Sequence, residues 1–185
     1  MLNDKVISTA TQKILGFFCL HPEQKFHGRD IAKQMGERSS SVQRALKILE
    51  REKILIPEQK GRMIFYSLNE ANPLVKPYKV VAIIAALEPL VKKLRKITDL
   101  IVLYGSSARG TYLTDSDVDL FVISSNEDDV WEILSRFSRN FVKEIKAVVH
   151  TLAEWTDVEE KNPVYAEEVN KGFILFQSEY YESRI

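Results

Sequence analysis

Cysteine is almost missing from the 185-residue sequence, which contains only Cys19. A single cysteine cannot form an internal disulfide, so a reducing cytoplasm is the expected setting. Cys19 stands within the apolar run ILGFFCL, which favours a packed core thiol over a reactive one. The three histidines are scattered and lack the spacing of zinc ligands.

Long apolar runs are missing as well. No segment reaches the ~18 apolar residues needed to cross a bilayer, and the N-terminal MLNDKVIST lacks the features of a signal peptide. The sequence therefore predicts a soluble protein without a membrane partner. Its length is enough for one ordinary domain or two small ones, each with a buried core.

The zero net charge hides an uneven distribution along the chain. Residues 1–75 contain 12 basic and 8 acidic side chains, and residues 76–96 contain 6 and 1. Residues 97–185 contain 8 basic and 17 acidic side chains. This division predicts a basic N-terminal module and an acidic C-terminal module.

The N-terminal module begins with three helix patterns. Apolar residues at helical spacing predict helices in residues 11–19, 27–36 and 39–53. Two strands follow in ILIPEQKGRMIFYSL (54–68), joined by a basic turn at Lys60-Gly61-Arg62. This order of elements predicts a helical module that ends in a basic hairpin.

This order resembles the winged helix-turn-helix domain of small prokaryotic transcription regulators, over about residues 5–70. The resemblance implies that the third helix enters the major groove of double-stranded DNA and that the hairpin touches the backbone. It implies two sets of contacts, to base edges from Ser41, Gln43 and Arg44, and to phosphates from Lys47, Lys60 and Arg62. The alternative is a protein-docking module on which these charges form only a solvated face.

A long apolar helix pattern joins the two modules. Pro77 suits a helix start and Pro89 is expected to break or kink the helix, which predicts a connecting helix at 71–88. The apolar positions recur at four- and three-residue steps and comprise Val80, Ile84, Leu87, Val91 and Leu94. This stripe either packs on the C-terminal module or pairs with a second copy, as in a homodimer bound to two half-sites.

The C-terminal module contains the segment LYGSSARGTYLTDSDVDLFVI (103–123), with a turn between two apolar strands. Asp117 and Asp119 lie two residues apart on an extended strand, so their side chains share one face. Two crowded carboxylates repel unless a cation lies between them, and such oxygen ligands suit Mg²⁺. A solvated turn is the alternative, but it does not explain Asp119 between Val118 and Leu120.

Gly105-Ser106, ten residues and Asp117-Val118-Asp119 together resemble the signature of the DNA polymerase β-like nucleotidyltransferase superfamily, in its minimal branch, over about residues 89–180. The resemblance implies ATP or another NTP as ligand, Mg²⁺ held by both aspartates, and transfer of a nucleoside monophosphate to a protein or small-molecule acceptor. Gly105 would let the backbone approach the triphosphate, while Ser106 and Arg109 would reach its phosphates. Minimal members are often paired with HEPN-type toxins, which implies an antitoxin-like role.

One position departs from the superfamily pattern. A third carboxylate is usual on the strand after the long helix, but strand alternation in EIKAVVH places Lys146 there. Glu144, two residues earlier on the same face, is the candidate substitute. The sequence leaves two hypotheses: a nucleotidyltransferase, or a DNA-binding regulator whose C-terminal domain only senses nucleotide or serves as a scaffold.

Together these patterns predict an α+β chain. The expected domains are a winged helix-turn-helix domain at 1–70, the connecting helix at 71–88, and a small α/β nucleotidyltransferase-like domain with a mixed sheet at 89–185.

Overall fold

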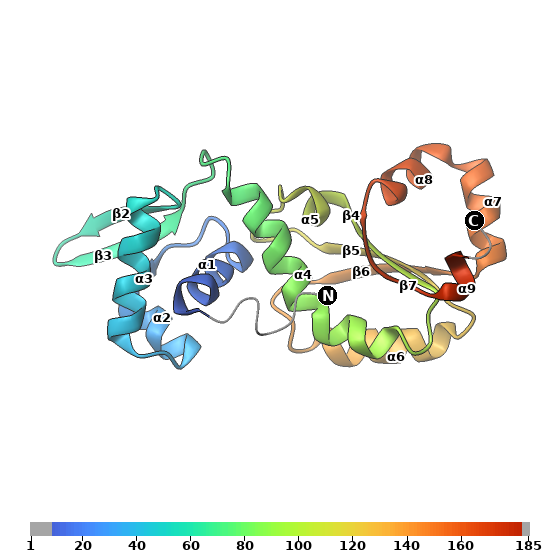
Figure 1. The fold of residues 1–185 in the computed structure, drawn as a ribbon, viewed down its shortest axis with the longest axis horizontal. Helices are drawn as coiled ribbons and strands as arrows, with labels where there is room; N and C mark the ends of the chain where they lie inside the picture. Colours follow the sequence, from blue (N-terminus) through green and yellow to red (C-terminus); the bar gives the residue numbers. More distant parts are fainter. Residues whose placement is uncertain (1–8, 183–185) are drawn as a thin grey trace. The chain divides into compact units, whose positions relative to one another are not determined.

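The computed structural model describes residues 9–182, which form nine helices and seven strands (Figure 1). The chain divides into two compact units between Ala85 and Ala86. None of the helices in this described range has the length and apolar character needed to cross a lipid bilayer.

The N-terminal unit combines three helices with a small antiparallel sheet. The helices are α1 (Ala10–Leu20), α2 (Gly28–Met35) and α3 (Ser39–Arg51). The strands are β1 (Phe26–His27), β2 (Leu55–Lys60) and β3 (Met63–Leu68), in the order β1-β3-β2. Because Lys60 pairs with Met63, the β2–β3 hairpin closes with two turn residues, Gly61 and Arg62. The predicted helices and hairpin are present, whereas the two-residue strand β1 was not predicted.

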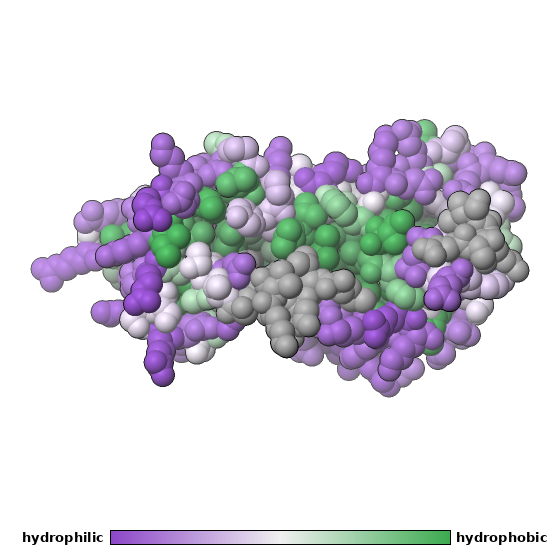
Figure 2. All heavy atoms as spheres, viewed as in Figure 1, coloured by the Kyte–Doolittle hydropathy of each residue, from purple (hydrophilic) through white to green (hydrophobic). Residues whose placement is uncertain are grey.

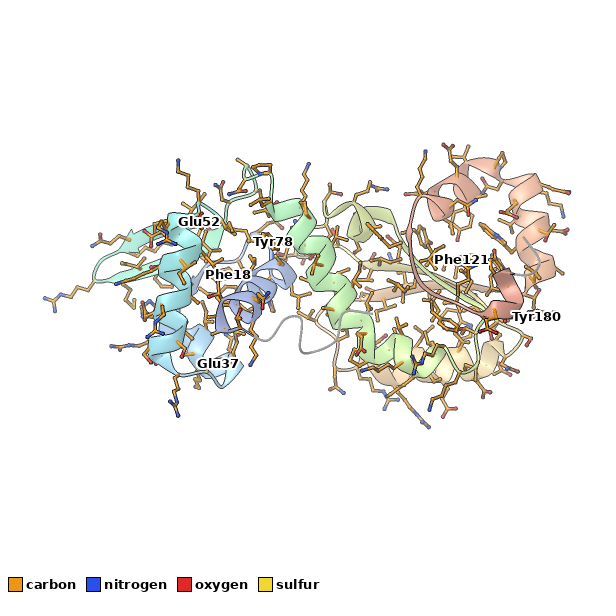
Figure 3. The ribbon with its side chains drawn as sticks, viewed as in Figure 1. Phe18, Glu37, Glu52, Tyr78, Phe121 and Tyr180 are labelled. Carbon is orange, nitrogen blue, oxygen red and sulfur yellow. The ribbon has the colours of Figure 1, made fainter. Side chains whose placement is uncertain are left out.

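The core of this unit forms where the apolar helix stripes meet. Helix α1 starts with a capping box in which Thr9 and Gln12 satisfy each other's backbone N–H groups. Phe18, labelled in Figure 3, is fully buried among the helices. Cys19 is also buried, and burial raises the pKa of its thiol to about 12. The prediction of an unreactive core thiol is therefore confirmed.

Helix α4 (Val75–Leu94) runs through Pro89, so the predicted break at this proline is wrong. Proline inside a helix loses one backbone hydrogen bond and costs about 3 kcal/mol. The turns around Pro89 bury Leu87, Leu90 and Leu94 completely, and each buried leucine contributes roughly 1.5–3 kcal/mol. This burial outweighs the cost of the proline, and the helix continues.

Pairing of this helix with a second copy, in a homodimer, stays a prediction.

The C-terminal unit is built on a four-stranded mixed sheet with the order β6-β5-β4-β7. Its strands are β4 (Leu100–Tyr104), β5 (Val118–Ile123), β6 (Ile145–His150) and β7 (Phe173–Gln177). Strand β4 pairs antiparallel with β5 and β7, whereas β5 and β6 are parallel. The predicted mixed sheet is confirmed. The helices are α5 (Gly105–Arg109), α6 (Glu127–Ser138), α7 (Leu152–Lys161), α8 (Pro163–Asn170) and α9 (Glu179–Glu182).

One face of this sheet packs against α7 and α8. Phe121 and Ile123 of β5 belong to the core on this face, together with Trp155 of α7 (Figure 3). Side chains alternate along a strand, so Asp119 emerges on the same face as Phe121, at the beginning of β5. The fold thus places Asp119 at the edge of an apolar core, beside the turn that follows β4.

Candidate nucleotide site

The turn after β4 brings Gly105 against Asp119. Gly105 adopts φ +68°, a left-handed conformation that glycine tolerates best. A Cβ atom at this position would overlap the Asp119 carboxylate oxygen Oδ2. The glycine therefore provides both the backbone conformation and the space that Asp119 occupies. Ser106 lies half-buried in the first turn of α5.

Asp117 lies one residue before β5, and the preceding helix supports it. The hydroxyl of Ser107 donates a hydrogen bond of 3.3 Å to the main-chain carbonyl of Asp117. Burial, and then the negative charge of Asp117, raise the pKa of Asp119 above its ordinary value. Lys146 opposes this shift. The two aspartates therefore share one electrostatic environment.

Lys146 lies directly against this pair. It is in register with Asp119 across the parallel β5–β6 ladder, and its ammonium lies 2.5 Å from Asp117 Oδ2. The hydrogen bond and charge of Asp117 raise the pKa of Lys146, so this cation is held in its charged form. The expectation that Lys146 faces the aspartates is confirmed. A side chain of this protein already neutralises part of the charge that would attract a metal ion.

Glu144 precedes β6 and stands level with Asp117 in the extended register. Its main-chain carbonyl accepts a 2.8 Å hydrogen bond from Val118, and its side chain is exposed. Among residues 9–182, no group of three or more acidic, histidine or cysteine side chains has the arrangement of a metal site. A metal here would have the two aspartates as its carboxylate ligands.

This donor set fits Mg²⁺, which commonly binds one or two protein carboxylates together with the phosphates of a nucleotide. Asp117 and Asp119 would hold the ion, while Gly105 and Ser106 would line the approach of the phosphates. The chemistry that Mg²⁺ would supply at these two carboxylates is positive charge that offsets the negative charge of the phosphates.

A cleft of about 490 Å³ opens beside Gly105, between α5 and α8. Arg109 extends from α5 into this cleft, where its Nη1 atom lies 3.1 Å from Oε1 of Glu168 on α8. Burial is the main cause that raises the pKa of Asp119, Tyr104 and Tyr165, and the charge of Glu168 adds to each of these shifts. Glu168 is thus an acidic neighbour of the site that the sequence analysis missed.

Lys143 was also missed. Only 5% of this residue is exposed, and its ammonium donates to the carbonyls of Leu113 and Thr114 at 2.7 and 2.9 Å. It also lies 5.0 Å from the ring centroid of buried Tyr112. Lys143 therefore fixes the loop that leads from α5 to Asp117.

A pair of tyrosines lies next to the site, and one of them, Tyr104, pairs with Asp119 across the β4–β5 ladder. The rings of Tyr104 and Tyr165 meet edge-to-face with centroids 6.0 Å apart. The Tyr165 hydroxyl is buried, and no hydrogen-bond partner for it is found in the part of the chain that the structure describes. Burial raises the pKa of both hydroxyls, so they remain protonated at neutral pH.

A second candidate surface lies on the N-terminal unit. Gln43, Arg44 and Lys47 of α3 are exposed, and Ser41 is half-buried. The side-chain nitrogen of Gln43 lies so close to Gly28 that a Cβ atom there would come within 2.5 Å of it. Gln43 therefore packs on the start of α2 as well as facing outward.

The basic hairpin tip belongs to the same unit, and it is hydrophilic (Figure 2). Lys60 lies 3.4 Å from Glu58 and 5.9 Å from the ring centroid of Phe65. Within residues 9–182, Arg44, Lys47 and Arg62 form no ion pair with a carboxylate. These three exposed cations are therefore accessible to an external negatively charged group.

Residues 84–176 match the family model of the nucleotidyltransferase domain. The match spans half of the chain and includes Gly105, both aspartates and Lys146. The chain therefore belongs to the nucleotidyltransferase domain family.

The solved structures with limited similarity to this chain include the two described below, and no curated protein matches it. The first is the adhesin competence repressor AdcR from Streptococcus pyogenes, 22% identical with a TM-score of 0.40, covering 52% of this chain and 71% of that one. The second is a toxin–antitoxin structure with AMP-PNP, 18% identical with a TM-score of 0.39, covering 54% and 77%. Similarity of this extent does not define a shared fold.

Proposed function

We propose that this protein is a DNA-binding transcription regulator whose nucleotidyltransferase-family domain binds a nucleoside triphosphate with Mg²⁺. The observation that carries the proposal is the convergence of Gly105, Asp117 and Asp119 at the end of β4 and the start of β5. Tight packing of Gly105 against the Asp119 carboxylate holds that carboxylate in place beside the cleft that Gly105 lines.

Titration of Mg²⁺–ATP into the full chain tests this proposal by calorimetry. Wild type is expected to bind, and Asp117→Ala/Asp119→Ala is expected to lose at least about tenfold in affinity, because metal sites lose their ion with their ligands. Omission of Mg²⁺ should weaken wild type more than the double variant. Absence of binding to wild type, with both ATP and GTP, would refute the nucleotide part of the proposal.

Transfer of a nucleoside monophosphate to a protein or small-molecule acceptor, such as a HEPN-type toxin, is the second candidate function. It is favoured by the pair of aspartates beside Gly105, and it is opposed by Lys146 in place of the third carboxylate. General base catalysis needs a group that can take the acceptor proton, and a charged lysine cannot do so. Release of pyrophosphate together with labelling of an added acceptor protein, in mixtures with Mg²⁺–ATP, would support transfer over binding alone.

The DNA-binding part of the proposal rests on the order of elements in the N-terminal unit. Helices α2 and α3 are followed by the β2–β3 hairpin, and α3 and the hairpin turn carry the exposed cations Arg44, Lys47 and Arg62. In a winged helix-turn-helix, α3 would lie in the major groove, with Arg44 at base edges and Lys47 at phosphates. Arg62 would meet the backbone from the hairpin tip.

Loss of these contacts is measurable with a mixed-sequence duplex of about 30 base pairs, long enough for two half-sites. Arg44→Ala/Arg62→Ala is expected to weaken binding at least about tenfold, because a base contact alone contributes ~1–3 kcal/mol. The slope of log affinity against log salt should fall by about 0.9 for the phosphate contact of Arg62.

The matched control is Arg136→Ala/Arg139→Ala, which removes the same charge from the C-terminal unit. An equal loss of DNA affinity in this control would mean that net charge, and not α3 with the hairpin, governs binding.

A further inference from the structure

The ion pair between Arg109 and Glu168 spans the cleft beside Gly105. These residues are 59 positions apart in the sequence, and each belongs to a different wall of the cleft, α5 and α8. Their side chains are 59% and 47% exposed, so solvent and ligands can reach both. An exposed pair of this kind contributes only about 0–1 kcal/mol, so a competing anion can replace it.

Glu168 is the side chain whose negative charge would repel a bound polyphosphate. Its negative charge acts on Asp119, Tyr104 and Tyr165, which places it within the electrostatic reach of the candidate metal ligands. Phosphates next to Gly105 would be attracted by Arg109 and repelled by Glu168. Arg109, however, already forms an ion pair with Glu168.

Resting on the proposed nucleotide binding, we propose that Glu168 is an internal competitor that occupies Arg109 until the phosphates of a nucleotide displace it. The cleft between α5 and α8 is then the entry for the polyphosphate, and the Arg109–Glu168 pair opens when the ligand binds. The ligand class is a nucleoside polyphosphate, because the competition is between two anions for one guanidinium, which pairs well with phosphate.

The neighbouring pair supplies a matched control. Glu167 also lines the cleft, but its partner is Lys171, one turn away on the same polypeptide segment, at 2.5 Å. Glu167 is 66% exposed and engages no residue of α5 in the described structure. Glu167→Gln removes the same charge from the same cleft and leaves Arg109 paired with Glu168.

The test is calorimetry of Mg²⁺–ATP, and of adenosine, with the full chain and its variants. Glu168→Gln is expected to bind Mg²⁺–ATP about five- to tenfold more tightly than wild type, since about 1 kcal/mol of competition is removed. Glu167→Gln should gain clearly less than Glu168→Gln, because it frees Lys171 and leaves Arg109 paired with Glu168. Adenosine binding should be the same in all variants, because adenosine has no phosphate.

A double-mutant cycle separates competition for Arg109 from simple repulsion of phosphate. Arg109→Ala should bind Mg²⁺–ATP more weakly than wild type, and Glu168→Gln should give no gain on that background. A full gain without Arg109 would overturn the competitor role, as would an equal gain in Glu167→Gln or weaker binding by Glu168→Gln. If wild type and every variant fail to bind, the proposed nucleotide function itself fails; binding with no gain overturns the competitor role alone.

Discussion

Gly105→Ala is expected to weaken Mg²⁺–ATP binding about 100-fold while leaving the protein folded. Alanine at φ +68° costs about 1–2 kcal/mol of stability, and its Cβ atom would overlap Asp119 Oδ2. The overlapping atom is the end of a side chain, so Asp119 can rotate away at a modest further cost. That rotation removes a metal ligand, and the loss of affinity should reach about 100-fold, the upper range for disturbed metal sites.

Gly36→Ala is the control that separates backbone strain from the site. Gly36 ends α2 with φ +63°, and a Cβ atom there would meet nothing within 4 Å. This variant should lose a similar 1–2 kcal/mol of unfolding free energy, by denaturant titration, and bind nucleotide like wild type. Equal nucleotide affinity in Gly105→Ala and wild type would show that Asp119 does not need its present position.

The parts of the site that were predicted from the sequence depend on short-range geometry. Spacing placed Gly105 at a turn and Asp117 and Asp119 on one strand face, and two-residue alternation placed Lys146 beside them. These relations hold because a strand fixes the direction of every second side chain. The register of β6 against β5 then confirms that Lys146 lies level with Asp119.

The parts that were not predicted depend on contacts between distant segments. Glu168 reaches Arg109 only because α8 packs beside β4, and no local pattern indicates that approach. Lys143 binds main-chain carbonyls, which leave no signature in the residue types around it. Helix α7 was overlooked although Thr151 and Glu154 form a capping box, a signal that the sequence does contain.

The second large effect is expected at Lys146, because this lysine stands where the superfamily usually has an acid. Lys146→Glu would replace the ammonium 2.5 Å from Asp117 with a carboxylate and create a site with three acids. The attraction or repulsion between charges grows as their separation falls, so a two-unit change in charge beside a divalent cation acts directly on its binding.

The lysine side chain is 61% exposed, and salt screens part of this energy. With this screening, affinity for a divalent cation should still rise about 10- to 100-fold, the range over which changes around a metal site alter its affinity. Mn²⁺ prefers the same oxygen ligands and its binding is measurable by electron paramagnetic resonance at fixed ionic strength, without nucleotide. The glutamate of this variant is also able to accept a proton from an acceptor. In a separate assay with Mg²⁺–ATP and an added acceptor, pyrophosphate release would show whether the variant catalyses transfer.

Lys171→Glu makes the same charge change at a lysine that is 70% exposed, against 61% for Lys146, and is paired with Glu167 instead of Asp117. It should leave Mn²⁺ affinity within about threefold of wild type, because screened charges at a distance contribute little. If Lys171→Glu gains as much as Lys146→Glu, the effect is one of overall charge. If Lys146→Glu gains nothing, Lys146 does not compete with a metal for Asp117, and the two aspartates serve another purpose.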